Sequence, residues 1–291
     1  MTTCYINGTF CESKEAQISA YDLGFLRGAG IFDVFRTYQR RPLFLKERLI
    51  RLAKGAYEAR IALREPLDQI EEIVYTLIDE NPGQELIFRL ILTKGVTEDW
   101  ITPLNDSSLI ILISPFTPLP THVRRDGIDT ITTKAVRTLP QIKSLNYLPA
   151  TVALEKAKAQ NAEEALYVTP QNEILEGTRS NFFAIKRGEL ITADRGIYGG
   201  FTRRLTLKVA KGRFPITLRP LHIDEIPHID EAFITASIHE ITPVVSIDQK
   251  IIGKGVVGDN TKKIAELLSA VFTKLSLDEL LDKPALHFDR T

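Results

Sequence analysis

The chain has 291 residues, of which 44% are hydrophobic and 25% charged. This is the composition of an ordinary globular protein, long enough for one large domain or two and able to fold without disulfides or a metal. Lys plus Arg number 37 and Asp plus Glu also number 37, so the formal net charge is zero. This balance argues against a nucleic-acid partner or a membrane-surface partner, although it leaves room for a local cluster of one sign.

The two cysteines, Cys4 and Cys11, are too few for a disulfide framework, and no Cys/His spacing predicts a metal site. They flank Asn7-Gly8, a hairpin signal, so they can face each other across two strands. The first ten residues lack the basic and apolar regions of a signal peptide, and no apolar run approaches the roughly 20 residues that span a bilayer. We therefore expect a cytoplasmic protein with reduced thiols.

In the first part of the chain, apolar periodicity and turn residues predict strands and helices in alternation. Gln39 to Pro42 form a turn, and the strand before it is rich in β-branched and aromatic residues. The predicted elements are a hairpin over 5–10, a strand over 30–38, a short strand over 43–45, helices over 46–59 and 67–79, and strands over 85–93 and 108–115.

Residues 116–121 hold two prolines and are typical of a linker. We therefore predict an α+β protein of two domains, with an N-terminal domain over 1–117, a linker over 118–127, a larger C-terminal domain over 128–275 and a loosely held polar tail over 276–291. The predicted elements of the second domain are strands over 128–137, 165–169, 173–175, 181–186, 190–191 and 232–235, a hairpin over 244–252, and helices over 148–160, 202–211 and 259–274.

Two other patterns do not lead to a function. Residues 253–258 match G-x-G-x-x-G, but only a helix and a polar tail follow, so the acidic residue that ends a second strand in a dinucleotide site has no place. We interpret this stretch as a glycine-rich hairpin end. The five histidines are scattered and indicate no catalytic or metal-binding cluster.

The informative stretch runs from Leu139 to Phe183. Lys143 lies between a predicted strand and a predicted helix, where an amine partly shielded from water can lose its proton and act as a nucleophile or base. Glu176 precedes Gly177 in a turn ahead of a second strand. Taken alone, each of these residues would be interpreted as a surface charge.

Together they belong to a more specific pattern: K-S-L-N-Y-L from Lys143, then E-E-A-L-Y-V, then L-E-G-T-R-S-N-F-F to Phe183. This pattern resembles the fold-type IV (class IV) pyridoxal-phosphate aminotransferases, which include branched-chain aminotransferases, D-amino-acid transaminases and aminodeoxychorismate lyase. The resemblance covers about residues 5–270 in the correct order. It implies a two-domain α+β fold with pyridoxal 5′-phosphate between the domains, and a homodimer with active sites near the subunit interface.

The resemblance also implies roles for individual residues. Lys143 would form the internal aldimine with the cofactor and then carry the proton between the substrate Cα and the cofactor. Glu176 would keep the pyridine nitrogen protonated, because the cofactor withdraws electrons well only while this nitrogen is charged. The other implied cofactor-binding residues are Arg51 for the phosphate, Phe201 and Thr202 through their backbone N–H groups, Ser237, Ile238, and Tyr147 for the phenolic oxygen.

The substrate class depends on how a carboxylate is held, and the sequence departs from both usual patterns. The loop over 93–100 lacks the Arg and His of common D-amino-acid transaminases, and the stretches over 32–38 and 87–90 depart from branched-chain enzymes. Arg48 replaces the usual helix histidine of the family, with little expected effect on the chemistry.

A bidentate arginine is the expected carboxylate ligand. Arg89 is one candidate because it interrupts an apolar strand, where an unpaired guanidinium would be costly to bury. The alternative is that Arg89 alternates outward to solvent. Arg27, which could reach a neighbouring subunit, and Arg179 are further candidates.

The stretches LRGAGIFDVF and IFRLIL most resemble D-amino-acid transaminases that lack the usual Arg/His loop. We therefore predict ping-pong transamination of D-amino acids with 2-oxoglutarate or pyruvate as acceptor. Branched-chain L-amino-acid transamination is the alternative, followed by aminodeoxychorismate lyase. A catalytically silent binding protein is disfavoured because Lys143 and Glu176 are both present.

Overall fold

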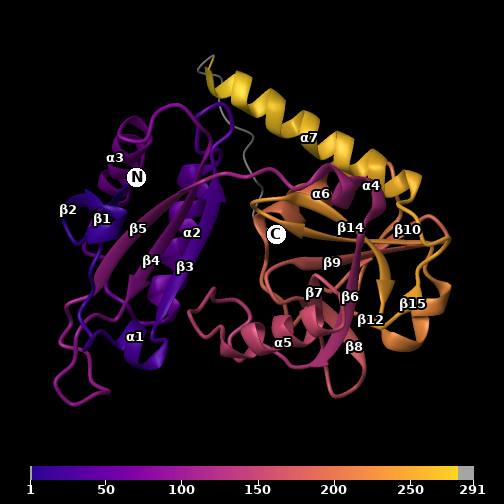
Figure 1. The fold of residues 1–291 in the computed structure, drawn as a ribbon, viewed down its shortest axis with the longest axis horizontal. Coiled ribbons are helices and arrows are strands. Elements are labelled where there is room, and N and C mark those ends of the chain that lie inside the picture. Colours follow the sequence, from indigo (N-terminus) through magenta and orange to yellow (C-terminus); the bar gives the residue numbers. More distant parts are fainter. Residues whose placement is uncertain (1, 281–291) are drawn as a thin grey trace.

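The computed structural model describes residues 2–280, with side chains to residue 274, and contains two sheets that lie side by side (Figure 1). The first sheet is wholly antiparallel, with strand order β2-β1-β5-β4-β3, so that β3 forms one edge. Its strands are β1 (Thr3–Ile6), β2 (Thr9–Glu12), β3 (Gly30–Arg36), β4 (Leu86–Thr93) and β5 (Ser108–Pro115).

Two amphipathic helices, α2 (Leu45–Glu58) and α3 (Leu67–Asp79), pack against this sheet. Their buried residues recur every three or four positions, as in Leu45, Leu49 and Leu52, and these side chains share one core with Phe35 and Phe88 of the sheet. A short 3-10 helix, η1 (Ser13–Glu15), and a short helix, α1 (Leu23–Arg27), precede β3.

The second sheet has ten strands in the order β11-β10-β9-β13-β14-β6-β7-β8-β12, with β15 paired to β14. An additional pairing of Glu176 with Asn181 joins β8 to β9, so six of the strands form a closed ring. The strands are β6 (Ile128–Lys134), β7 (Glu164–Val168), β8 (Glu173–Gly177), β9 (Asn181–Lys186), β10 (Glu189–Thr192), β11 (Ile216–Leu218), β12 (Leu221–His222), β13 (Glu231–Ala236), β14 (Glu240–Ile247) and β15 (Lys250–Ile251).

Helices cover the second sheet from several sides (Figure 1). The helices α6 and α7 pack together over a core that includes Phe183, Phe233 and Leu268. The helix α5 covers β6 and β7 through small residues, Ala153 and Ala157. The helical segments are α4 (Thr121–Asp126), α5 (Leu148–Ala159), α6 (Phe201–Ala210), the 3-10 helix η2 (Ile223–His228) and α7 (Asp259–Leu280).

The loop between β6 and α5 crosses to the edge of the first sheet. The backbone N–H of Phe32 donates to the carbonyl of Lys143 at 2.9 Å, and the N–H of Leu145 donates to the carbonyl of Gly30 at 2.9 Å. A buried ion pair between Arg36 and Glu240, at 2.6 Å, also joins the first part of the molecule, which contains the first sheet, to the second part, which contains the second sheet. Lys143 is therefore held at the junction between the two sheets by contacts with β3.

The alternation of helices and strands confirms the predicted α+β class, but several elements differ from the prediction. The expected strand over 43–45 is wrong: Leu43 and Phe44 instead pack into the core of the second part, and Leu45 begins α2. The expected strand over 128–137 ends at Lys134, and α4 lies inside the expected linker. Helix α7 extends to Leu280, whereas residues 281–291 of the expected tail lie outside the described residues.

Cys4 and Cys11 are direct partners in the β1–β2 hairpin, an arrangement that the hairpin signal allowed, and their sulfur atoms lie 3.6 Å apart and are not bonded to each other. Within residues 2–280, no helix is both long enough and apolar enough to cross a membrane.

Candidate active site

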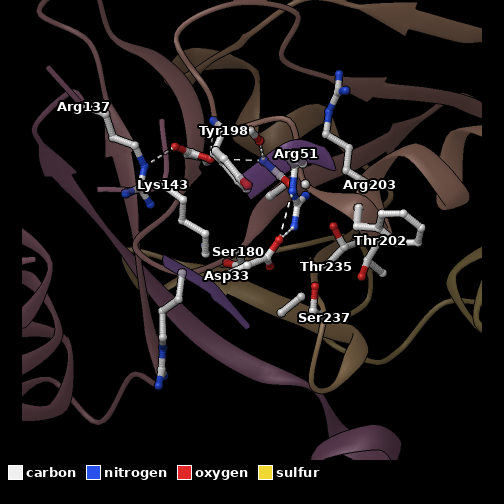
Figure 2. Close-up of a pocket in the computed structure, with 16 residues that line it drawn as sticks. Asp33, Arg51, Arg137, Lys143, Ser180, Tyr198, Thr202, Arg203, Thr235 and Ser237 are labelled. Atoms are coloured by element: carbon white, nitrogen blue, oxygen red, sulfur yellow. Dashed lines mark hydrogen bonds and ion pairs between the residues drawn. The ribbon is translucent and has the colours of Figure 1, made fainter. Parts of the chain in front are cut away.

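A polar pocket lies between the two parts of the molecule (Figure 2). The first part contributes Asp33 from β3 and Arg51 from α2, and the second part contributes the other lining residues. These are Arg137, Lys143, Glu176, Arg179, Ser180, Asn181, Tyr198, Gly200, Phe201, Thr202, Arg203, Thr235, Ala236 and Ser237. Four arginines and one lysine face three acidic or amide side chains, so this pocket is locally cationic within a neutral chain.

Lys143 presents its amine between two aromatic rings. Its Nζ lies 4.9 Å from the ring centre of Phe32 and 4.7 Å from that of Tyr198. Burial lowers the pKa of Lys143 to about 8, a shift that Asp33 partly opposes and Arg137 reinforces. At pH 7 roughly one amine in ten is then neutral, against fewer than about one in a thousand for an ordinary lysine. Lys143 is therefore suited to act as a nucleophile and as a base.

Glu176, at the end of β8, is a buried carboxylate with three donors. Its Oε1 accepts from Nε of Arg137 at 2.6 Å, and its Oε2 accepts from Nδ2 of Asn181 and the backbone N–H of Tyr198, both at 3.1 Å. Burial raises the pKa of Glu176, whereas Arg137 opposes that shift. The arrangement fixes the carboxylate and directs it into the pocket, where it can stabilise a cationic ring nitrogen.

Arg51 projects from α2 into the pocket and is fixed by Asp33. Its Nη2 and Nε lie 2.5 and 3.2 Å from Oδ2 of Asp33, and Nη1 of Arg48 lies 3.7 Å from the other carboxylate oxygen. Although burial opposes ionisation, Arg51 and Arg48 hold the pKa of Asp33 below its ordinary value. Among the described residues, Nη1 of Arg51 is buried without a hydrogen-bond partner, so the guanidinium keeps one donor available for an anion.

The start of α6 completes the anion-binding end of the pocket. Its first residues, Phe201 and Thr202, line the pocket, and within residues 2–280 no side chain caps this helix start. A side chain at Gly200 could not be accommodated, because its Cβ would lie 2.1 Å from Oδ1 of Asn181. The hydroxyl of Thr235 is buried without a partner in the described part of the chain. A helix N-terminus, an arginine and a hydroxyl together form a suitable site for a phosphate.

The structure brings seven of the predicted site residues to the pocket: Arg51, Lys143, Glu176, Arg179, Phe201, Thr202 and Ser237. Tyr147, Ile238, Arg89 and Arg27 do not line it. The ring of Tyr147 packs edge-on against that of Phe32, with their centres 5.3 Å apart. Ile238 is half-buried in the turn between β13 and β14.

Arg89 is exposed on β4, as the alternative of an outward-facing arginine predicts. Its guanidinium carbon lies 5.7 Å from the ring centre of Phe32, on the same aromatic side chain that Lys143 contacts. Arg27 is exposed on α1 and donates to the neighbouring carbonyl of Leu26 at 3.1 Å.

Sequence reasoning missed Asp33, Arg137, Asn181 and Tyr198 as pocket residues. For Asp33 a signal existed, because a carboxylate buried in the apolar strand GIFDVF needs a charged or hydrogen-bonding partner. Arg137 and Tyr198 lie in irregular segments, where no periodicity indicates which way a side chain points.

Comparison with known proteins places this chain in a family of aminotransferases. Residues 30–247 match the amino-transferase class IV family, so the chain belongs to that family. A putative branched-chain-amino-acid aminotransferase of Methanocaldococcus jannaschii is 32% identical over 279 residues, covering 93% of this chain and 96% of the relative. The D-alanine aminotransferase of Staphylococcus haemolyticus is 29% identical over 273 residues, covering 91% and 96%.

Solved structures share the fold at lower identity. The branched-chain amino acid aminotransferase of Escherichia coli superposes with a TM-score of 0.85 at 23% identity, covering 94% of this chain and 95% of that one. The branched-chain aminotransferase of Thermoproteus uzoniensis gives a TM-score of 0.85 at 22% identity, covering 96% and 97%. This confirms the predicted fold-type IV architecture.

Class IV aminotransferases use pyridoxal 5′-phosphate, and the residues of the pocket fit this cofactor. The free buried donor of Arg51 and the unpaired hydroxyl of Thr235 suit a phosphate, Glu176 suits a pyridinium nitrogen, and Lys143 suits an aldehyde. Three chemically different groups therefore meet in one pocket, as a cofactor with three such ends requires.

Proposed function

We propose that this protein transfers amino groups from D-amino acids to 2-oxoglutarate or pyruvate. The observation that carries the aminotransferase part is the convergence of a partly neutral Lys143, a buried Glu176 and Arg51 with a free donor on one pocket. The preference for D-amino acids is supported by several staphylococcal D-alanine aminotransferases at 28–29% identity and by the resemblance of LRGAGIFDVF and IFRLIL.

Each pocket residue would contribute a separate physical effect. Pyridoxal 5′-phosphate, when bound, withdraws electrons from the substrate Cα and so makes its proton removable. Lys143 would hold the cofactor through its aldehyde, and once the amino group of the substrate has displaced this amine, the neutral amine would take and return the Cα proton. Glu176 keeps positive charge on the ring nitrogen, with Arg137 and Asn181 fixing the carboxylate. Arg51 and the start of α6 anchor the phosphate.

Arg89, Arg179 and Arg27 are proposed to bind the substrate carboxylates. Arg179 lines the pocket, and its side chain is 62% exposed, with Nε 3.8 Å from Glu164. This weak, solvated pairing leaves Arg179 free to reorient towards a substrate. The guanidinium of Arg89 and the amine of Lys143 both lie near the ring of Phe32, so Arg89 is close to the residue that would hold the reacting amino group. Arg27 would serve a neighbouring subunit's site.

The dimer that this last role requires is part of the proposal. Exposed apolar side chains cluster where α1 meets the loop after β4: Phe25 is 69% exposed, Ile101 is 73% exposed, and Trp100 contacts Tyr21 with ring centres 5.8 Å apart. A patch of this kind near Arg27 suits a subunit contact.

Replacing Arg89 by Ala tests the carboxylate assignment. We expect the KM for 2-oxoglutarate to rise by an amount equivalent to ~2–3 kcal/mol while kcat changes much less, because a charge-assisted contact to the bound dicarboxylate would be lost. Steady-state kinetics with both 2-oxoglutarate and pyruvate measures this, with Arg125→Ala on exposed α4 as the matched control. An unchanged KM would assign Arg89 to structure alone.

The substrate class is tested by comparing D-alanine and D-glutamate with L-leucine as donors, each with 2-oxoglutarate. The proposal expects kcat/KM to be higher for the D-amino acids. Branched-chain L-amino-acid transamination is the second candidate, favoured by the relative from M. jannaschii at 32% identity. Faster turnover of L-leucine would establish that candidate, whereas turnover of neither donor with release of product from aminodeoxychorismate would identify a lyase.

A further inference from the structure

The side chain of Tyr198 lies beside both Lys143 and Arg51 in the pocket. Its ring centre is 4.7 Å from Nζ of Lys143 and 5.2 Å from the guanidinium carbon of Arg51 (Figure 2). The proposed function gives these two residues neighbouring substituents of one flat ring, with the aldehyde at Lys143 and the phosphate group at Arg51. Tyr198, which contacts both residues, is therefore placed beside the position of the ring that carries these two groups.

The main chain of Tyr198 is tied to the third cofactor-directed residue. Its backbone N–H donates to Oε2 of Glu176 at 3.1 Å, and its carbonyl accepts from Nδ2 of Asn181 at 2.8 Å and from the N–H of Gly200 at 2.8 Å. These bonds fix the root of the side chain relative to Glu176. The ring of Tyr198 thus has a defined position relative to all three groups.

A second hollow adjoins the pocket and shares with it only Asp33, Arg51, Lys143 and Tyr198; its other walls include Ile31, Phe32 and Leu52. Glu176, Thr202 and Ser237 all belong to the first pocket. A cofactor ring held by these residues would lie in the first pocket, which Tyr198 also lines.

We propose that Tyr198 is a positioning residue whose aromatic ring stacks on the face of the cofactor ring. This inference rests on the proposed function. An offset stack between two aromatic rings stabilises their contact beyond the burial of area. Because the main chain of Tyr198 is bonded to Glu176, the stack would set the plane of the cofactor relative to Glu176 and Lys143. Burial raises the pKa of the Tyr198 hydroxyl, which therefore stays neutral.

Two variants separate the aromatic ring from the hydroxyl and from mere bulk. Tyr198→Phe keeps the ring and removes the hydroxyl, whereas Tyr198→Leu keeps an apolar side chain and removes the ring. We expect the dissociation constant for pyridoxal 5′-phosphate to rise by about threefold to tenfold in the Leu variant and to stay within about twofold of the wild type in the Phe variant. The visible circular dichroism band of the bound cofactor should weaken in the Leu variant alone.

Cofactor-free protein, titrated with pyridoxal 5′-phosphate and followed by absorbance, gives the dissociation constants. Thermal unfolding of the same cofactor-free variants checks that the fold is retained. Equal affinity and equal dichroism in the Leu variant and the wild type would overturn the stacking role, as would equal losses in the Phe and Leu variants. If the wild type itself fails to bind the cofactor, the proposed function fails instead, and the two failures are thereby distinguished.

Discussion

Replacing Lys143 by Ala should abolish transamination, lowering kcat by roughly three to four orders of magnitude. The amine of Lys143 lies near the rings of Phe32 and Tyr198. Its pKa is lowered to about 8, so part of the amine is neutral at pH 7 and can act as a nucleophile. Loss of this amine removes both the covalent attachment of the cofactor and the base that moves the Cα proton. Initial rates with D-alanine and 2-oxoglutarate measure the effect.

Two additions make this result specific for the chemistry of Lys143. Lys158→Ala, which removes an exposed lysine from α5, serves as the matched control and should leave kcat unchanged. A small primary amine such as methylamine, added to the Lys143→Ala protein, should restore part of the rate because it supplies the missing base. A Lys143→Ala protein that turns over at the wild-type rate would remove Lys143 from the mechanism.

The second large effect is expected for Glu176→Gln, which should lower kcat by roughly a hundredfold to a thousandfold. The amide has nearly the same shape but only one oxygen, so it keeps either the bond from Arg137 or the bonds from Tyr198 and Asn181, and it loses the negative charge. Without that charge, and with Arg137 still beside it, the ring nitrogen loses its proton and the Cα proton becomes harder to remove. The KM for the amino acid should change much less than kcat.

Glu173→Gln is the matched control for this charge. Glu173 lies on the same strand, β8, and also pairs with an arginine, Arg195, at 2.9 Å, but it does not line the pocket. Activity of Glu173→Gln should equal that of the wild type. A Glu176→Gln protein whose kcat stays within threefold of the wild type would show that the ring nitrogen does not depend on this carboxylate.

The residues that sequence patterns predicted well are those held by regular elements and a continuous motif. Arg51, Phe201 and Thr202 lie on predicted helices, but their roles came from the resemblance of the surrounding motifs, and Arg51 alone has the pattern of a helix-surface arginine. The roles of Lys143 and Glu176 came from the resemblance of the surrounding motif, because each alone has the pattern of a surface charge.

The parts that could not be predicted depend on contacts between distant segments. Leu43 and Phe44 look like a strand, but tertiary packing places them in the core of the second part instead. Tyr198 reaches the pocket through bonds to Glu176 and Asn181, which no local periodicity encodes. Arg89 is exposed because burial alternates along β4, and the continuously apolar sequence LIFRLIL does not indicate which of its residues face outward.

The central claim is that Lys143 carries the cofactor in the pocket between the two sheets. Protein loaded with pyridoxal 5′-phosphate should be yellow, and borohydride should bleach it and fix the cofactor on a single lysine. Peptide mass spectrometry should find the modified lysine in the peptide that contains Lys143, and no stable modification in the Lys143→Ala protein. A label on another lysine, or a protein that takes up no cofactor, would contradict the account.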